Sequence, residues 1–193
     1  MNLSGGASAP PLFPGGNDQM NAVMAVCDGI NRGIGSLVRW LALFMVLLQF
    51  FIVVLRYVFG VSFIFLDESV LYLHASLFML GAGYTLLVDR HVRVDIFYSN
   101  ASARGRALID LIGHICLLFP AMLVLLAFSW PSVTRSWATL EGPISVGGIP
   151  ASFLLKSLIP AFCVLLMIQG VACVLRDGLR LRALPVKEPR ALS

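Results

Sequence analysis

Long charge-free stretches recur along the chain, separated by short clusters of charged residues. These stretches cover residues 40–55, 57–66, 69–88, 111–134 and 157–175. The first two are interrupted by Arg56 alone and count as one span. A helix rises about 1.5 Å per residue, so about 20 apolar residues cross a hydrocarbon core that is roughly 30 Å thick. Because the alternating polar pattern of a membrane β-barrel is missing, the sequence predicts an all-α integral membrane protein with four transmembrane helices.

The composition supports a membrane environment. Hydrophobic residues make up 59% of the 193 residues, charged residues only 12%, and the mean hydropathy is +0.89. Soluble domains carry about 25% charged residues, and a domain this small keeps too much surface to hide so many apolar side chains. The net charge of +4 is not gathered in a basic patch interleaved with aromatic residues. We therefore expect contact with membrane lipid and no nucleic-acid partner.

The two ends of the chain differ from its middle. Residues 1–19 are rich in Gly, Pro, Ser and Asn and show no apolar period, which is typical of a disordered segment. The first apolar stretch begins too late for a signal peptide and lacks a small-residue cleavage site, so we expect it to stay in the mature protein. We expect a flexible N-terminal tail over residues 1–30, a four-helix membrane domain over residues 31–182 and a C-terminal tail over residues 183–193.

Basic residues predict the orientation of the four spans. Four spans place both ends of the chain on one side, and eleven of the 14 Lys and Arg residues lie on that side. The opposite side carries only Arg56, Arg135 and Lys156. Because Lys and Arg concentrate in cytoplasmic loops, both termini and the loop over residues 89–110 are predicted to be cytoplasmic. Residues 60–68 and 135–150 are predicted to lie on the opposite side.

Motifs for catalysis or metal binding are missing from the sequence. The four cysteines show no CxxC spacing, and no GxSxG, HExxH or phosphate-binding loop occurs. Two histidines fall within predicted spans, His74 and His114, and such a pair could hold a haem. Their expected depths differ by more than about 10 Å, whereas a haem needs its two ligands nearly level. We therefore expect no cofactor, no metal and no enzymatic activity, with each imidazole hydrogen-bonded to a neighbouring helix.

Three charged residues bracket the first outer loop, namely Arg56, Asp67 and Glu68. An unpaired arginine at membrane depth is costly, and a helical hairpin would bring both acids close enough to pair with it. One alternative is that these residues contact another subunit. A proton relay is a third reading, but no carboxylate lies deeper in the membrane to receive the proton.

In the second span, Ser69, Ser76 and Gly83 recur every seven residues on one face. Small residues let another helix approach closely. That helix belongs either to this chain or to a partner.

A charged segment ends the second span abruptly. It contains Asp89, Arg90, His91, Arg93 and Asp95. The arginines are explained by orientation of the chain in the membrane. Acidic residues contribute little to orientation, so the acids are predicted to cap neighbouring helices or to bind basic residues of a partner.

Several short motifs occur in an order that resembles a known family. The chain reads "RYVFG", "DES", "GAGYTLLVDRHVRVDIFY", "SW" with Glu141, "GGIP", "K", "IP" and "QG". Together they resemble the small membrane subunit of tripartite ATP-independent periplasmic (TRAP) transporters, over about residues 31–182. The segment "GGIPASFLLKSLIP" is similar to the mannitol/chloroaromatic-type branch. The family's loop has a serine where this chain has Pro143, which affects only the expected local shape of the loop.

The resemblance implies a role in transport. In this family a soluble periplasmic protein captures an organic acid, and a large membrane subunit carries the substrate and sodium sites. The small four-helix subunit binds the large one in the bacterial inner membrane and enlarges its static scaffold. The family's inner-loop motif matches His91, Val92, Arg93, Val94 and Asp95. Its other recurring positions match Arg56, Asp67, Glu68, Gly81, Gly83, Gly148, Pro150, Lys156, Pro160 and Gln169.

A second function class fits four membrane helices as well. The chain could be the membrane anchor subunit of a redox enzyme. A cofactor spectrum distinguishes this alternative from a transporter subunit.

Overall fold

The computed structural model describes residues 18–88 and 102–183, and all regular structure in these ranges is helical. The elements are α1 (Asp18–Val58), α2 (Ile64–Leu87), α4 (Ala103–Ile112), η1 (Gly113–Leu118), α5 (Phe119–Ala138) and α6 (Ser152–Ala183). The elements α4, η1 and α5 follow one another without a break and form the third membrane-length helix. Four helices are long and apolar enough to cross a membrane, which confirms the predicted fold class.

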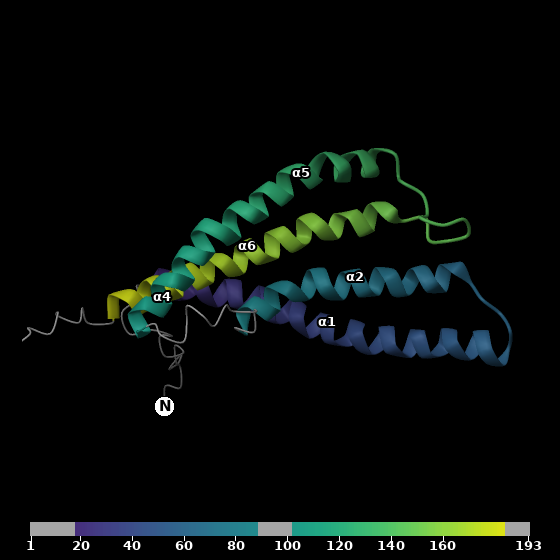
Figure 1. Cartoon of the computed structure of the whole chain (residues 1–193), viewed down its shortest axis with the longest axis horizontal. Helices are drawn as coiled ribbons and strands as arrows, with labels where there is room; N and C mark the ends of the chain where they lie inside the picture. The colour runs from purple at the N-terminus through teal and green to yellow at the C-terminus, as the bar shows by residue number, and fades with distance from the viewer. Residues whose placement is uncertain (1–17, 89–101, 184–193) are drawn as a thin grey trace, which may run out of the picture.

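The helices form two hairpins that meet at one end and separate at the other (Figure 1). One hairpin consists of α1 and α2, and the other of α5 and α6. They converge where α1 begins and α6 ends, and they diverge toward the two loops that close the hairpins (Figure 1). Helix α6 contacts α1, α2, α4, η1 and α5, so it is the central helix of the bundle. Most of the buried side chains lie on it.

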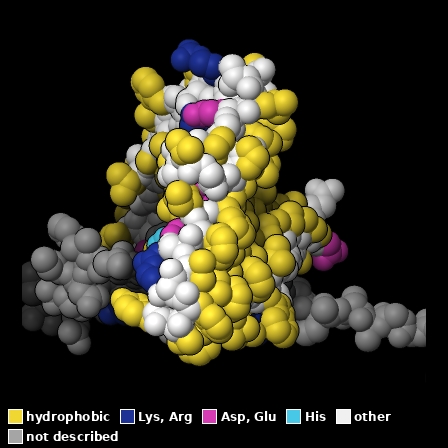
Figure 2. Space-filling view, turned by 90° about the vertical axis from the view of Figure 1, so that its right-hand side faces the viewer, with side chains coloured by type: hydrophobic (Ala, Val, Ile, Leu, Met, Phe, Trp, Pro, Cys, Tyr) yellow, Lys and Arg dark blue, Asp and Glu magenta, His cyan; other side chains and the backbone are white. Residues whose placement is uncertain are grey.

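Apolar side chains cover the outside of the bundle. Phe128 on α5 is 81% exposed and Phe50 on α1 is 68% exposed. Figure 2 shows hydrophobic side chains over much of the surface that faces the viewer. A soluble protein would bury these groups, whereas in a bilayer they face hydrocarbon at no cost.

Helix α1 starts earlier than the sequence predicted. It begins at Asp18, whereas the flexible tail was expected to reach residue 30. The extra turns form because Met20, Met24 and Cys27 pack against α6, on a cluster of Ala172, Leu175 and Leu179. This contact between segments far apart in the sequence orders residues whose composition suggests a loop. At about 1.5 Å per residue, the 41 residues of α1 extend over roughly 60 Å.

A π-helical turn interrupts the third span. The N–H of Phe119 donates to the carbonyl of His114, five residues earlier. Pro120 follows directly and has no N–H to donate, so the α-helical ladder is already incomplete at this point. Gly170 on α6 lies opposite, and a Cβ on it would lie 2.7 Å from the side chain of Leu118. The wide turn and the missing side chain together let the third span lie close to α6.

Gly83 lies where three helices come together. A Cβ on Gly83 would overlap Asn31 Oδ1 of α1 and would lie 3.3 Å from Cβ of Leu165 on α6. The hydroxyls of Ser69 and Ser76 instead donate to carbonyls one turn earlier in α2. Gly83 therefore serves packing within this chain, the first of the two alternatives left open by the sequence.

The Gly83 contact generates the first prediction. Replacing Gly83 with alanine forces the Asn31 side chain out of a buried position, and overpacking of this kind costs about 1–3 kcal/mol. We expect Gly83→Ala to lower the thermal unfolding midpoint of the purified chain in detergent. Gly81→Ala is the matched control, because its Cβ would lie 3.5 Å from Val38 Cγ1, an ordinary contact. Equal midpoints for the two variants would contradict the close packing at Gly83.

Candidate functional site

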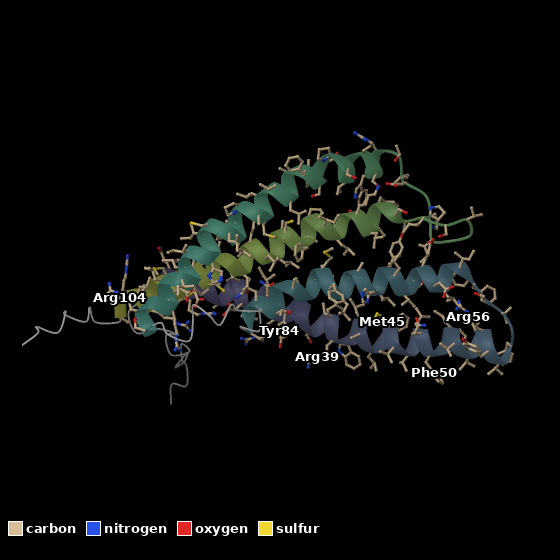
Figure 3. The ribbon with its side chains drawn as sticks, viewed as in Figure 1. Arg39, Met45, Phe50, Arg56, Tyr84 and Arg104 are labelled. Atoms are coloured by element: carbon tan, nitrogen blue, oxygen red, sulfur yellow. The ribbon has the colours of Figure 1, made fainter. Side chains whose placement is uncertain are left out.

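The polar side chains of the bundle gather at its two ends. The first hairpin is closed at the divergent end by Arg56 and Asp67, which form an ion pair of 3.2 Å. Ser62, in the intervening loop, accepts a second bond from Arg56 at 3.4 Å. Figure 3 shows Arg56 near the end of α1. This confirms the predicted pairing of Arg56 with an acid, although both side chains are about half exposed and such pairs stabilise by at most about 1 kcal/mol.

The sequence predicted that Asp67 and Glu68 both lie close enough to pair with Arg56, but Glu68 does not pair with it. It is buried and accepts the backbone N–H groups of Ser145 at 2.8 Å and Ile149 at 2.7 Å. Gly148 lies so close that any side chain there would overlap the carboxylate, and Gly147 has a φ of +85°. These two N–H groups, four residues apart in the loop, hold the carboxylate between them, and we call this site the Glu68 nest. Glu68 therefore ties the α5–α6 loop to α2 across the gap between the hairpins.

The same loop is held on its other side by Glu141. Its carboxylate accepts from Lys156 on α6 and from Ser136 on α5. The ammonium of Lys156, followed by the Ser136 hydroxyl, lowers the pKa of Glu141 below its usual range. Ser152 is the first residue of α6, and its hydroxyl donates to the carbonyl of Gly142 in the loop. Pro150, one of the positions that match the family, is exposed and lies two residues before α6.

At the convergent end, a chain of buried hydrogen bonds joins α1 to α6. Asn31 donates to Gln169 at 3.0 Å, and Gln169 donates to Asp28 at 3.0 Å. Arg176 completes the chain with an ion pair to Asp28 of 2.7 Å. Asn31 and Gln169 are fully buried. Sequence reasoning missed Asp28 because it fell within the expected tail over residues 1–30, and missed Asn31 because it lies before the first charge-free stretch, although an apolar spacing at Met24 and Cys27 was available as a signal.

His114 joins the third span to α6 at the same end. Its Nδ1 lies 3.5 Å from Asp177 Oδ2, and Arg180 lies 3.4 Å from the other oxygen of Asp177. A cavity of about 70 Å³ adjoins these groups. The predicted hydrogen bond to a neighbouring helix is not formed within the described residues, because His114 Nδ1 is buried without a hydrogen-bond partner and Asp177 lies only at ion-pair distance.

His74 differs from that prediction. It is exposed on α2, and its ring centroid lies 4.7 Å from that of Phe78 on the same helix. The two histidines thus face different surroundings, one on the surface of α2 and one against α6.

The inner-loop candidates His91, Arg93 and Asp95 lie outside the described residues, so their predicted roles stay predictions. Within residues 18–88 and 102–183, no group of three or more metal-binding side chains occurs. All four cysteines are free thiols. The polar groups that the structure brings together link helices in pairs, so their arrangement supports assembly of the bundle.

The chain is similar to proteins of known families. The family described as tripartite ATP-independent periplasmic transporters, DctQ component, matches residues 45–180. The C4-dicarboxylate TRAP transporter small permease protein DctQ of Vibrio cholerae serotype O1 (strain ATCC 39315 / El Tor Inaba N16961) is 32% identical over 98 residues. That match covers 48% of this chain and 42% of the Vibrio protein, less than half of either. No solved structure matches this chain.

The Glu68 nest generates the second prediction. In Glu68→Ala the N–H groups of Ser145 and Ile149 lose their acceptor, and a lost partner costs about 1–3 kcal/mol per buried donor. We expect amide hydrogen exchange across residues 142–151 to quicken about tenfold or more. Asp67→Ala is the control, because its carboxylate bonds Arg56 and not the loop. Unchanged exchange in Glu68→Ala, or equal exchange in both variants, would show that the nest does not order the loop.

Proposed function

This chain belongs to the DctQ component family of the TRAP transporters, and from that membership we propose that it is the small permease subunit that anchors a large transport subunit. The family is a transporter component and not an enzyme, and the chain is a multi-pass protein of the inner membrane. The match over residues 45–180 is the observation that carries the proposal. Because the matched family is a transporter component, the match argues against the alternative that the chain anchors a redox enzyme in the membrane.

The architecture supports an anchoring role. A transport subunit that moves substrate needs a partner that stays in place in the bilayer. Here the ion pairs and hydrogen bonds at both ends tie helices of this chain to one another. The long apolar surfaces of α1 and α5 contribute area for contact with lipid and with a partner. A bundle fixed in this way suits a static scaffold.

The proposal also covers the class of compound that is transported and the ion that is transported with it. We infer that a periplasmic binding protein delivers an organic acid, and that the large subunit carries it inward together with sodium. This chain would then hold no substrate ligand. The C4-dicarboxylate in the name of the Vibrio protein belongs to that protein, and the ligand of the binding protein would identify the substrate here.

The inner loop is the proposed docking segment for the large subunit. Orientation in the membrane accounts for the arginines but leaves the carboxylate of Asp95 unexplained. In an extended segment, Val92 and Val94 turn to one side while Arg93 and Asp95 turn to the other. A partly desolvated Asp95 needs a donor, which a basic residue of the large subunit can supply.

Orientation generates the third prediction. We expect both termini and the loop over residues 89–110 to be cytoplasmic and the α5–α6 loop to be periplasmic. On a cysteine-free background, a membrane-impermeant thiol reagent added from the periplasm should label Ser145→Cys and spare Ser102→Cys. The Ser145 substitution keeps the backbone N–H that bonds Glu68. Labelling of Ser102→Cys alone would reverse the orientation.

Asp95 generates the fourth prediction. Removing one member of a buried ion pair strands the other and costs about 3–5 kcal/mol. We expect Asp95→Ala to lower both co-purification with the large subunit and substrate uptake, while the chain still inserts at normal levels. Arg90→Ala is the control and should have much less effect, because ten cytoplasmic basic residues remain. Wild-type assembly and uptake in Asp95→Ala would refute docking through this segment.

A further inference from the structure

A small polar cavity lies where the third span meets α6 at the convergent end of the bundle. Its volume is about 70 Å³, and the end of α2 closes it together with α4, η1 and α6. Figure 1 shows α4 beside the last turns of α6 at this end. The titratable side chains in its lining are Asp110, His114, Cys173, Arg176, Asp177 and Arg180. We call this site the His114 cavity.

His114 brings a buried nitrogen atom to the cavity. Asp110 and His114 lie four residues apart, so both side chains are on the side of the third span that faces α6. His114 Nδ1 is buried and has no hydrogen-bond partner among the described residues. In native proteins the large majority of buried polar atoms bond to protein or to ordered water, because an unpaired one costs free energy.

Asp177 has unused acceptor capacity in the same cavity. The residue is 4% exposed, and its two carboxylate oxygens lie 3.5 Å from His114 Nδ1 and 3.4 Å from Arg180. Charge-assisted bonds are about 2.7–2.9 Å long, as in the 2.7 Å ion pair of Asp28 with Arg176. A carboxylate offers about four acceptor sites. The two long contacts of Asp177 therefore leave sites for further donors.

The charge and the size of the cavity select its occupant. Two acids and two arginines line it, so their formal charges cancel and favour a neutral molecule. An apolar molecule would leave the buried nitrogen and the carboxylate unpaired. A water molecule takes up roughly 30 Å³, so the volume suits about two of them. Water both donates and accepts, which satisfies Asp177 and either tautomer of His114.

An apolar layer bounds the cavity on the side of the membrane centre. Leu86 and Leu166 are buried against Cys173, and Leu118 packs on this cluster. Leu118 lies one turn deeper in the third span than His114. Solvent therefore reaches the cavity from the charged end of the bundle and not from the hydrocarbon.

We infer that the His114 cavity is a water-binding site, in which about two molecules bridge His114 Nδ1 and the carboxylate of Asp177. The contact between the third span and α6 is then hydrated at this end and dry at the adjacent apolar layer. The site exchanges its water with the solvent at the convergent end. It goes beyond the proposed function, because it belongs to this chain alone and does not depend on a large subunit.

Proton exchange at a native thiol tests the site, because Cys173 lines the cavity. The full chain keeps Cys173 as its single cysteine, is reconstituted in lipid bilayers and is transferred to heavy water. The infrared S–H stretch then reports exchange, which needs contact with water. We expect the thiol to exchange while the backbone amide of Cys173 stays protected, which excludes local unfolding as the cause.

Two other thiols on α6 are the controls. Cys163 is fully buried and lies outside the lining of the cavity. Ala172→Cys places a thiol at nearly the same depth as Cys173, on the side of α6 that packs against Met24 and Leu179. We expect each control, as a single cysteine, to exchange at least tenfold more slowly than Cys173. If Cys173 exchanges no faster than both controls, or only together with its amide, the proposal is overturned.

The two histidines of the spans supply a second test without a change in the cavity. Solid-state NMR of the chain with nitrogen-15 histidine, in bilayers, measures the transfer of magnetisation from water to each imidazole. His74 is exposed on α2, where its surroundings are lipid, whereas His114 is largely buried. We expect transfer to His114 to be severalfold faster than transfer to His74, the reverse of their order of exposure. His91→Gln removes the third histidine signal, and transfer to His114 no faster than to His74 would overturn the proposal.

Discussion

The arrangement of this bundle depends on the absence of a hydrophobic force between its helices. Lipid tails are as apolar as leucine side chains, so burying leucine against leucine stabilises little inside a bilayer. What remains is close packing at small residues and a few polar bonds between helices. The structure uses both at defined places: Gly83 and Gly170 allow close approach, and polar links occupy the two ends. Where the hairpins diverge, an open apolar groove of about 440 Å³ is lined by Leu80, Leu126 and Val164 among others.

The sequence was sufficient for the four spans because their physical cause is local. A charge-free stretch of bilayer length is visible in the residues themselves, and each of the four membrane-length helices contains one, although the first stretch runs past the end of α1 at Val58 into the loop and the start of α2. The pairing of Arg56 with Asp67 was also predictable, since a short hairpin leaves them few other positions. These features need no knowledge of which helix lies beside which.

The sequence was insufficient where the cause is contact between distant segments. The early start of α1 depends on α6, whose packing residues lie more than 140 positions later. Glu68 was assigned to the nearby Arg56, because the loop that binds it is 77 to 81 residues away and its shape depends on backbone N–H groups. In the sequence, the only sign of the π-helical turn is Pro120. A proline is equally compatible with the first turn of an ordinary α-helix, so it does not predict the π-helical turn. These features depend on which residues of two helices lie opposite each other. The apolar pattern within a single helix does not determine that register.

The central position of α6 has a consequence for the order of biosynthesis. The partners of Asp28, Asn31 and Glu68 outside their own helices all belong to the last third of the chain. During translation the α1–α2 hairpin can enter the membrane early, yet it then carries polar groups whose acceptors and donors have not been made. These groups must remain hydrated at the lipid headgroups until the last hairpin arrives. The bundle is therefore complete only once α6 has been made, and a chain that stops before α6 leaves these polar groups without their partners on the last hairpin.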